Sequence, residues 1–327
     1  IPKNDEFFGE YIPDHKDRLK YISDFSGSFG FALILNNKNY LFVDGRYTLQ
    51  ANKQSGKIFQ IKTLPLELPA NVLKNKKLKI GYDPKLFTNK SLNFFFGNTN
   101  CKFISLDKNL IDEIWIRTKN KIKNKFFILP SSSIGENYKI KVNKIISNLN
   151  KKGADIQFIT ASENNAWLLN IRGSDSKYTP IPYSYILLDK KKNIKFFCDL
   201  KKISTSFKKN FNNIKFLNIN STSEILSKIN GKKILIDKNT CSIFYENIIF
   251  KNNKVLNQQD SILSLKAIKT KKEIENIKKA HIYDGAALTK YLFWLKNNFL
   301  KKNITEISGE KKLLSFRKQN KSFNFLS

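Results

Sequence analysis

The chain has 327 residues, of which 41% are hydrophobic and 13% aromatic, which is enough to fill two ordinary domains and part of a third. This composition excludes a chain that is disordered throughout, and no run reaches the roughly 18 apolar residues of a membrane-spanning helix. The net charge of +32 suggests nucleic acid, but only five of the 59 basic residues are Arg, the side chain best suited to phosphate and guanine. Lys, Asn, Ile and Phe are all used heavily, so we attribute the charge to an AT-rich coding background and expect neither a nucleic-acid nor a membrane partner.

The two ends and the cysteines carry further information. The chain contains no Met, Ile1–Lys3 looks like neither an initiator nor a signal peptide, and Phe323–Ser327 has the pattern of a strand entering a core. We therefore expect a chain cut at both ends.

The cysteines, Cys101, Cys198 and Cys241, lie far apart without a CxxC pair, which predicts reduced, buried thiols and a cytoplasmic location.

In chain order, the first predicted element is a β-hairpin. Residues 31–35 and 40–44 are two runs rich in strand-forming residues, and a short polar turn separates them. Residues 45–54 can form a short helix. Further strands are predicted at residues 59–64, 78–82 and 102–106.

A second segment begins with a helix. Tyr138, Val142, Ile145 and Leu149 are spaced i, i+4, i+7 and i+11, which places them on one helical face, and Gly153 follows as a C-terminal signal. The remaining predicted elements are a strand at 155–160, a second hairpin formed by 183–189 and 193–199, and a strand at 232–237.

The two segments repeat the same order of elements. A polar Gly-Ser turn, a hairpin and a later strand recur at an offset of about 150 residues. We interpret them as two copies of one α/β domain. The first copy lacks the helix and strand that open the second.

A third segment begins near Leu265 and is helical. Thr270 and Glu273 match a capping box, and apolar residues then follow a helical stripe. The stripe consists of Ile274, Ile277, His281, Leu288, Leu292 and Leu295. A second helix is predicted from about Thr305, so the segment is a helical pair with no domain after it.

Two Arg-containing turns are candidate functional sites. Arg46, in Asp44-Gly45-Arg46-Tyr47, follows a hairpin strand and could clamp a carboxylate or carbonyl, but the residues alone favour a structural pair with a neighbouring Asp. Arg172 and Asp175 follow an aromatic helix end. A structural pair between these two side chains is again the favoured interpretation.

The residues alone indicate a scaffold and no catalytic centre. His15 and His281 are the only histidines; His281 lies on the apolar stripe and is predicted to be buried, whereas His15 is predicted to be exposed. No HExxH cluster, glycine-rich phosphate loop or Ser-His-Asp set is present.

Taken together, several motifs resemble aminopeptidase P, the Xaa-Pro aminopeptidase branch of the creatinase and prolidase superfamily of metallopeptidases. They are Val43–Tyr47 with Leu49–Ala51, Ala166–Asp175, and Lys279–Asp284 with Phe293–Leu295 and Thr305–Ile307. The resemblance runs from end to end. It implies an α/β fold with two tandem creatinase-like N-terminal domains, each a mixed sheet flanked by helices. They occupy residues 1–125 and 126–264, and residues 265–327 are the first helices of a truncated pita-bread catalytic domain.

The resemblance also implies an activity. Family members release the N-terminal residue that precedes proline, use two divalent metal ions, usually Mn²⁺, and are commonly dimers. Their metal ligands and catalytic residues fall beyond Ser327, so we assign no catalytic or metal residue here and expect the chain itself to be inactive. Arg46 is the one position that matches a substrate-binding residue of the family.

Two functions remain open on these grounds. The chain is either a fragment of an active Xaa-Pro aminopeptidase or a non-catalytic dimerisation and peptide-binding module of the same family. An uncovered stripe along residues 274–295 argues against the second, since exposed apolar faces promote aggregation.

Overall fold

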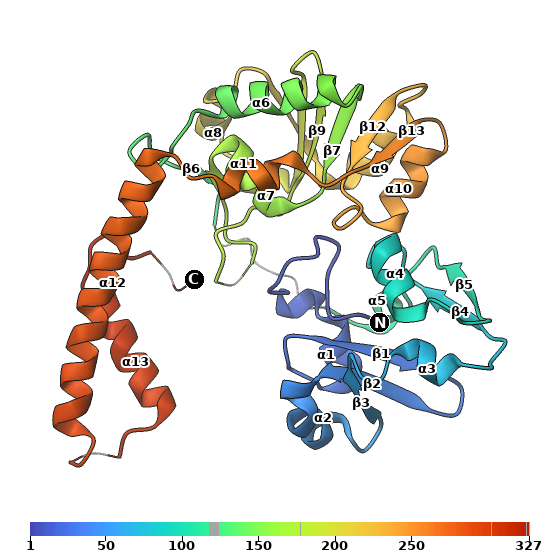
Figure 1. Cartoon of the computed structure of the whole chain (residues 1–327), viewed down its shortest axis with the longest axis horizontal. Helices are drawn as coiled ribbons and strands as arrows, with labels where there is room; N and C mark the ends of the chain where they lie inside the picture. The colour runs from blue at the N-terminus through green and yellow to red at the C-terminus, as the bar shows by residue number, and fades with distance from the viewer. Residues whose placement is uncertain (118–123, 177, 302, 325, 327) are drawn as a thin grey trace. The chain divides into compact units, whose positions relative to one another are not determined.

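A computed structural model describes residues 1–117, 124–176, 178–301, 303–324 and 326 (Figure 1). The chain divides into two compact units. The first contains residues 1–128 and 138–265, and the second contains residues 129–137 and 266–327. Both predicted repeats lie in the first unit.

The second repeat is built on a six-stranded sheet in the order β11-β10-β9-β7-β12-β13. Its strands are β7 (Ile156–Ile159), β9 (Tyr185–Asp189), β10 (Ile194–Cys198), β11 (Ile214–Asn218), β12 (Lys233–Ile236) and β13 (Lys254–Asn257). β9 runs antiparallel to β7 and β10, and the other neighbours are parallel. The predicted hairpin and the strands predicted at 155–160 and 232–237 are therefore confirmed.

Helices cover both faces of this sheet. They are α6 (Tyr138–Lys151), α7 (Ser162–Leu169), α8 (Thr205–Lys209), α9 (Thr222–Ser227), α10 (Ile243–Phe250) and α11 (Ser261–Ala267). Successive strand residues point to opposite faces, so Ile186 and Leu188 pack with α6 and α7, while Tyr185 and Leu187 pack with α9 and α10. Figure 1 shows α6 lying along the sheet that contains β7 and β9. The four apolar residues that predicted α6 are all buried.

The first repeat has the same strands with one exception. A three-stranded sheet, β1-β2-β3, and a two-stranded sheet, β4-β5, take the place of one continuous sheet. The strands are β1 (Gly30–Ile34), β2 (Asn39–Asp44), β3 (Gln60–Leu64), β4 (Lys79–Tyr82) and β5 (Lys102–Ser105). The β1–β2 hairpin is antiparallel, and β2–β3 and β4–β5 are parallel, as in the corresponding pairs of the second repeat. These strands confirm the predictions, and β7 has no counterpart among the described residues.

Short helices pack on the two faces of the first repeat. They are α1 (Arg18–Ser23), α2 (Thr48–Ser55), α3 (Pro69–Leu73), α4 (Asn89–Phe96) and α5 (Leu110–Ile114). On β1, Phe31 and Leu33 pack with α3 and α4, whereas Ala32 packs with α1 and α2. Successive residues of β1 therefore face two different layers of the core of this repeat.

The two repeats share a buried contact at the start of α10. The backbone N–H of Ile243 donates to the carbonyl of Phe87 at 2.8 Å, and that of Phe244 donates to the carbonyl of Pro84 at 3.0 Å. The Ile243 side chain belongs to the apolar core of the first repeat. In addition, β6 (Phe127–Ile128) pairs with β8 (Ile171–Arg172), which connects the end of the first repeat to the second.

The second unit is mainly a helical hairpin of α12 (Lys271–Asn298) and α13 (Glu306–Arg317). The predicted capping box is present, since the N–H of Glu273 donates to Thr270 Oγ1 at 3.3 Å and Thr270 donates back to the Glu273 carboxylate at 2.8 Å. Arg317 pairs with Asp284 across the hairpin, with 2.6 Å between Nε and Oδ1. The helix predicted from about Thr305 is confirmed, and Thr305 caps it. Among the described residues, no helix combines the length and the apolar character needed to cross a bilayer.

Two predictions for this unit are wrong. His281 is exposed rather than buried, because within this unit the described residues leave much of the α12 stripe uncovered, including Ile274 at 42% and Leu292 at 54% exposure. The strand predicted at 323–327 is also absent where the structure describes it. Phe323, Asn324 and Leu326 are irregular, and a strand requires a neighbouring edge with which to pair.

Replacing Thr270 by Ala is expected to cost about 1 kcal/mol of α12 stability, because the first backbone N–H groups of a helix then lose their side-chain acceptor. The loss of helical circular dichroism with temperature measures the effect. Thr289→Ala, inside the same helix, is the matched control and is expected to be neutral or slightly stabilising. Equal melting of Thr270→Ala and the parent chain would contradict the role of the cap.

Candidate functional site: the Asp44–Arg46 turn

Arg46 lies where the first hairpin passes into a helix. β2 ends at Asp44, a single 3₁₀ turn follows at Gly45–Tyr47, and α2 begins at Thr48. The Asp44 carboxylate accepts the Arg46 backbone N–H at 2.9 Å and its Nε–H at 2.8 Å, and the Nη2 nitrogen lies 3.3 Å from the second carboxylate oxygen. The Asp therefore both closes the turn and orients the guanidinium.

The guanidinium is exposed even though it is paired. Its side chain is 73% exposed, and its central carbon lies 5.4 Å from the centroid of the Tyr47 ring. The hydrogen bond from Arg46 lowers the pKa of Asp44, and the same bond raises the pKa of Arg46, so the pair stays ionised. Within the described part of the chain, Nη1 makes no hydrogen bond, so donors remain available to a ligand.

A polar network that sequence reasoning missed lies beside Arg46. The Tyr47 hydroxyl is 2.7 Å from Ser28 Oγ, and the amides of Gln50 and Gln54 each donate to Ser26 Oγ at 2.9 Å. These contacts attach the loop before β1 to α2. The i, i+4 spacing of the two glutamines was the available signal, because it places both on one face of the helix.

The second Arg-containing turn is structural, but not in the predicted way. The predicted pair between Arg172 and Asp175 is wrong. Arg172 donates to the carbonyls of Ala166 at 3.1 Å and Ile171 at 2.9 Å, and burial lowers the pKa of its guanidinium. Asp175 instead pairs with Lys202 and accepts the backbone N–H of Tyr183 at 2.7 Å.

Gly173 lies between these two residues, and the surrounding atoms are too close to leave room for a side chain. A Cβ at this position would lie 2.9 Å from the Phe126 ring and 2.9 Å from the Cα of Pro182. Any larger residue therefore forces the surrounding backbone to move. This explains the residue pattern of the turn as packing rather than chemistry.

The histidines and thiols form no catalytic arrangement in the described structure. His15 is half-buried, which corrects the prediction that it is exposed, and burial lowers its pKa. Cys198 and Cys241 are buried, and burial raises the pKa of each thiol, so neither is a ready nucleophile. Cys101 is only half-buried, which differs from the prediction.

A metal site in a protein requires several His, Cys, Asp or Glu side chains that converge on one point. Nowhere in the described ranges do three or more His, Cys, Asp or Glu side chains come together in an arrangement that could hold a metal. The described part of this chain therefore does not supply a metal cage, and no chemical step through a metal is assigned to its residues.

Sequence reasoning also missed an ionic cluster around Arg18. This side chain is only 5% exposed, and it donates to both oxygens of Asp112 at 2.8 Å and to Glu6 at 2.6 Å. Arg117 also pairs with Asp112. The cluster joins the N-terminal loop to α5. The rarity of Arg in this Lys-rich chain was the available signal, since Arg suits buried forked pairs.

The chain matches the creatinase/prolidase N-terminal domain family twice, at residues 11–114 and at residues 117–273. These matches and the repeated sheet define the class: two creatinase-like N-terminal domains in tandem. Over its whole length the chain is 32% identical to the probable Xaa-Pro aminopeptidase P of Laccaria bicolor and 32% identical to Xaa-Pro aminopeptidase 1 of Dictyostelium discoideum. The chain belongs to the Xaa-Pro aminopeptidase family of the creatinase and prolidase superfamily. It spans 53% and 56% of the lengths of these two relatives.

A solved structure has the same fold. The X-prolyl aminopeptidase of Caenorhabditis elegans, described as a cytosolic enzyme with a di-nuclear active site, is 25% identical to the chain with a TM-score of 0.88. The match covers 99% of this chain and 56% of that protein. The similarity therefore extends over both units described here.

Proposed function

We propose that this chain is the front part of a Xaa-Pro aminopeptidase that releases the N-terminal residue of a peptide whose second residue is proline. The observation that supports this most strongly is the end-to-end similarity to Xaa-Pro aminopeptidases in both sequence and structure. Relatives are nearly twice as long, so the proposal assigns catalysis to a part of the enzyme that the described residues do not include.

The proposal separates binding from bond cleavage. Two divalent metal ions, which we propose to be Mn²⁺, act in the whole enzyme, and the di-nuclear site of the Caenorhabditis elegans protein supports that number. Because the described residues offer no metal cage, the 327-residue chain is proposed to be inactive by itself.

Arg46 is the proposed contribution of this chain to substrate binding. Asp44 holds its guanidinium in place, and its outer edge is open to solvent. A planar guanidinium recognises a carboxylate or a carbonyl through parallel hydrogen bonds, and both groups occur on a peptide. The geometry is compatible with a clamp that orients the substrate.

The remaining parts of the proposal concern organisation. Residues 1–125 and 126–264 are the two N-terminal domains, and residues 265–327 begin the catalytic domain. We also propose a homodimer, without a nucleic-acid or membrane partner, in the cytoplasm; the cytosolic description of the Caenorhabditis elegans enzyme supports the location. No observation favours the alternative of a purely non-catalytic binding module, and the exposed stripe of α12 speaks against it.

A chimeric enzyme tests the proposal. Residues 1–327 are joined to the C-terminal part of Dictyostelium discoideum Xaa-Pro aminopeptidase 1 that the chain does not match, and release of the first residue is measured with Mn²⁺. We expect the chimera to exceed the chain alone by about a thousandfold or more, a modest part of a typical enzymatic acceleration. A peptide with Ala in the second position and the C-terminal part alone are the controls. Hydrolysis by the 327-residue chain at the rate of the chimera, or a folded chimera without activity on Xaa-Pro peptides, would contradict it.

A further inference from the structure

The guanidinium of Arg46 has an aromatic neighbour in addition to its carboxylate partner. Asp44 accepts hydrogen bonds from Nε at 2.8 Å and from Nη2 at 3.3 Å, which fixes one edge of the guanidinium. These bonds restrain the tilt of the plane only weakly, because an oxygen acceptor accepts over a broad range of directions. The central carbon also lies over the Tyr47 ring, 5.4 Å from its centroid, so the ring covers one face of an otherwise exposed group.

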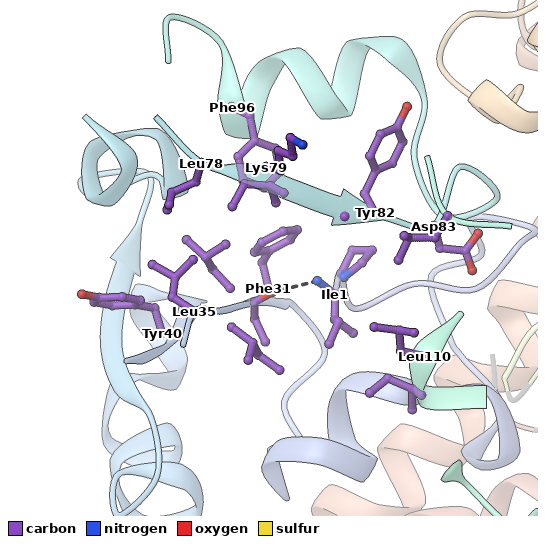
Figure 2. A pocket seen from close by; sticks show the side chains of 18 of the residues that line it. Ile1, Phe31, Leu35, Tyr40, Leu78, Lys79, Tyr82, Asp83, Phe96 and Leu110 are labelled. Carbon is purple, nitrogen blue, oxygen red and sulfur yellow. Dashed lines mark hydrogen bonds between the residues drawn. The ribbon is translucent and has the colours of Figure 1, made fainter. Parts of the chain in front are cut away.

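Tyr47 can support Arg46 because its own ring is packed. The residue is half-buried and lies against an apolar layer of the first repeat, with the fully buried Phe25 ring edge-on at 6.0 Å between centroids. The opposite face of the same hairpin borders a cavity of about 860 Å³, and Figure 2 shows Phe31 and Tyr40 beside it. Tyr47 packs on the face away from this cavity, where neighbouring side chains leave its ring few other positions.

A hydrogen bond fixes the other end of the Tyr47 side chain. Its hydroxyl lies 2.7 Å from Ser28 Oγ. The loop that contains Ser28 is itself attached to α2. Gln54 accepts the backbone N–H of Ser26 at 3.0 Å, and Gln50 donates to Ser26 Oγ at 2.9 Å. Tyr47 is thus restrained at its ring by the core and at its hydroxyl by the loop before β1.

We propose that Tyr47 is a positioning residue, whose restrained ring holds the Arg46 guanidinium in the orientation that the substrate requires. Asp44 fixes one edge and the ring supports one face. Nη1, which makes no hydrogen bond within the described residues, stays available to a carbonyl or carboxylate of the peptide. Orientation matters because a misplaced binding group loses much of its effect. This inference rests on the proposed function and deepens it, since it assigns Tyr47 and Ser28 to the support of Arg46.

NMR relaxation of the Arg side-chain nitrogens tests this support without peptide hydrolysis. The chain has five Arg, so selective labelling gives few Nε signals, and the signal lost in Arg46→Ala identifies that of Arg46. We expect Tyr47→Leu to lower the order parameter of Arg46 Nε by at least about 0.2, because rigid and flexible groups differ by roughly that amount. The Nε of Arg18, which is 5% exposed, is the internal control and is expected not to change.

Two milder variants keep the test independent of any folding defect in Tyr47→Leu. Tyr47→Phe and Ser28→Ala each remove the hydrogen bond and keep the ring. Each is therefore expected to lower the order parameter of Arg46 Nε by less than Tyr47→Leu does, and the two effects are expected not to add. Tyr40→Leu removes an aromatic ring from the other face of the hairpin and is the matched control, without effect on Arg46.

Kinetics of the chimeric enzyme test the consequence for the substrate. Tyr47→Leu is expected to lower kcat/KM for Xaa-Pro peptides about tenfold, between the few-fold value of an exposed cation–π contact and the roughly 100-fold cost of a misplacement of about 1 Å. With Arg46→Ala already present, Tyr47→Leu is expected to have no further effect, because a positioning residue acts only through the group that it holds. A purely structural role would lower kcat/KM by the same factor in both backgrounds.

Either of two results overturns the inference. One is an unchanged order parameter of Arg46 Nε in Tyr47→Leu, and the other is an equal loss of kcat/KM from Tyr47→Leu with and without the Arg46 side chain. An Arg46→Ala chimera with full activity would instead contradict the substrate role of Arg46 in the proposed function. The relaxation measurement would still decide whether Tyr47 holds the guanidinium, so the two failures are distinguishable.

Discussion

Replacing Arg46 by Ala in the chimeric enzyme is expected to lower kcat/KM for Xaa-Pro peptides by about 100-fold. A hydrogen bond to a charged group contributes about 1.5 to 3 kcal/mol, and a factor of 100 corresponds to about 2.7 kcal/mol of lost transition-state stabilisation. Arg46→Lys keeps the charge but loses the fork, so it is expected to recover only part of the loss. Steady-state kinetics with a peptide that has proline second gives the values.

The controls separate binding from folding. Lys53→Ala removes an exposed cation from α2, the helix that follows Arg46, and is expected to leave kcat/KM unchanged. The Arg46→Ala chimera is also expected to keep its thermal midpoint, because an exposed ion pair such as Arg46–Asp44 adds little stability. A kcat/KM unaffected by Arg46→Ala would remove this residue from the substrate site.

Replacing Arg18 by Ala is expected to lower the free energy of unfolding by about 3 kcal/mol. The guanidinium is almost fully buried, and its loss leaves the carboxylates of Glu6 and Asp112 with one partner fewer in a partly desolvated place. Urea titration followed by fluorescence measures the change. Lys90→Ala, which removes an exposed lysine from the same repeat, is the matched control and is expected to cost less than about 0.5 kcal/mol.

The same cluster has a pH dependence with a definite sign. Burial raises the pKa of Glu6, but Lys16 and Arg18 outweigh it and hold that pKa below its usual value. Burial also raises the pKa of Asp112, but the hydrogen bonds from Arg18 and Arg117 lower it by more, so the net shift is downward. Carboxylates with lowered folded-state pKa values stabilise the fold above about pH 4.5 and lose that contribution as the pH falls. The cost of Arg18→Ala is therefore expected to shrink between about pH 5 and pH 2, and a constant cost would contradict this account.

Sequence patterns predicted the elements whose periodicity is strong. Both hairpins were predicted because two runs of strand-forming residues flank a short polar turn, and α6 was predicted because its apolar residues have helical spacing. β11 and β13 were missed. They are parallel edge strands of five and four residues, only partly buried, and they lie among Lys and Asn residues that carry no alternating signal.

The candidate site was predictable only where its contacts are local. The pairing of Asp44 with Arg46 could be anticipated because the two residues are two positions apart and separated by a turn. The cluster of Arg18 with Asp112 could not, since it depends on how segments 94 residues apart meet. The carbonyl partners of Arg172 lie close in the sequence, but the side chain bonds to backbone groups that a residue pattern does not single out. The exposure of His281 depends on which other residues pack on α12. The spacing of apolar residues along the helix does not give that information.

The contact between α10 and the first repeat has a consequence for how the molecule melts. Because Ile243 contributes to a core that otherwise belongs to the first repeat, neither repeat can lose its structure without exposing apolar surface of the other. Such shared surface couples two domains into a single cooperative transition. The two repeats have similar strand orders, but we expect heat or denaturant to unfold them together.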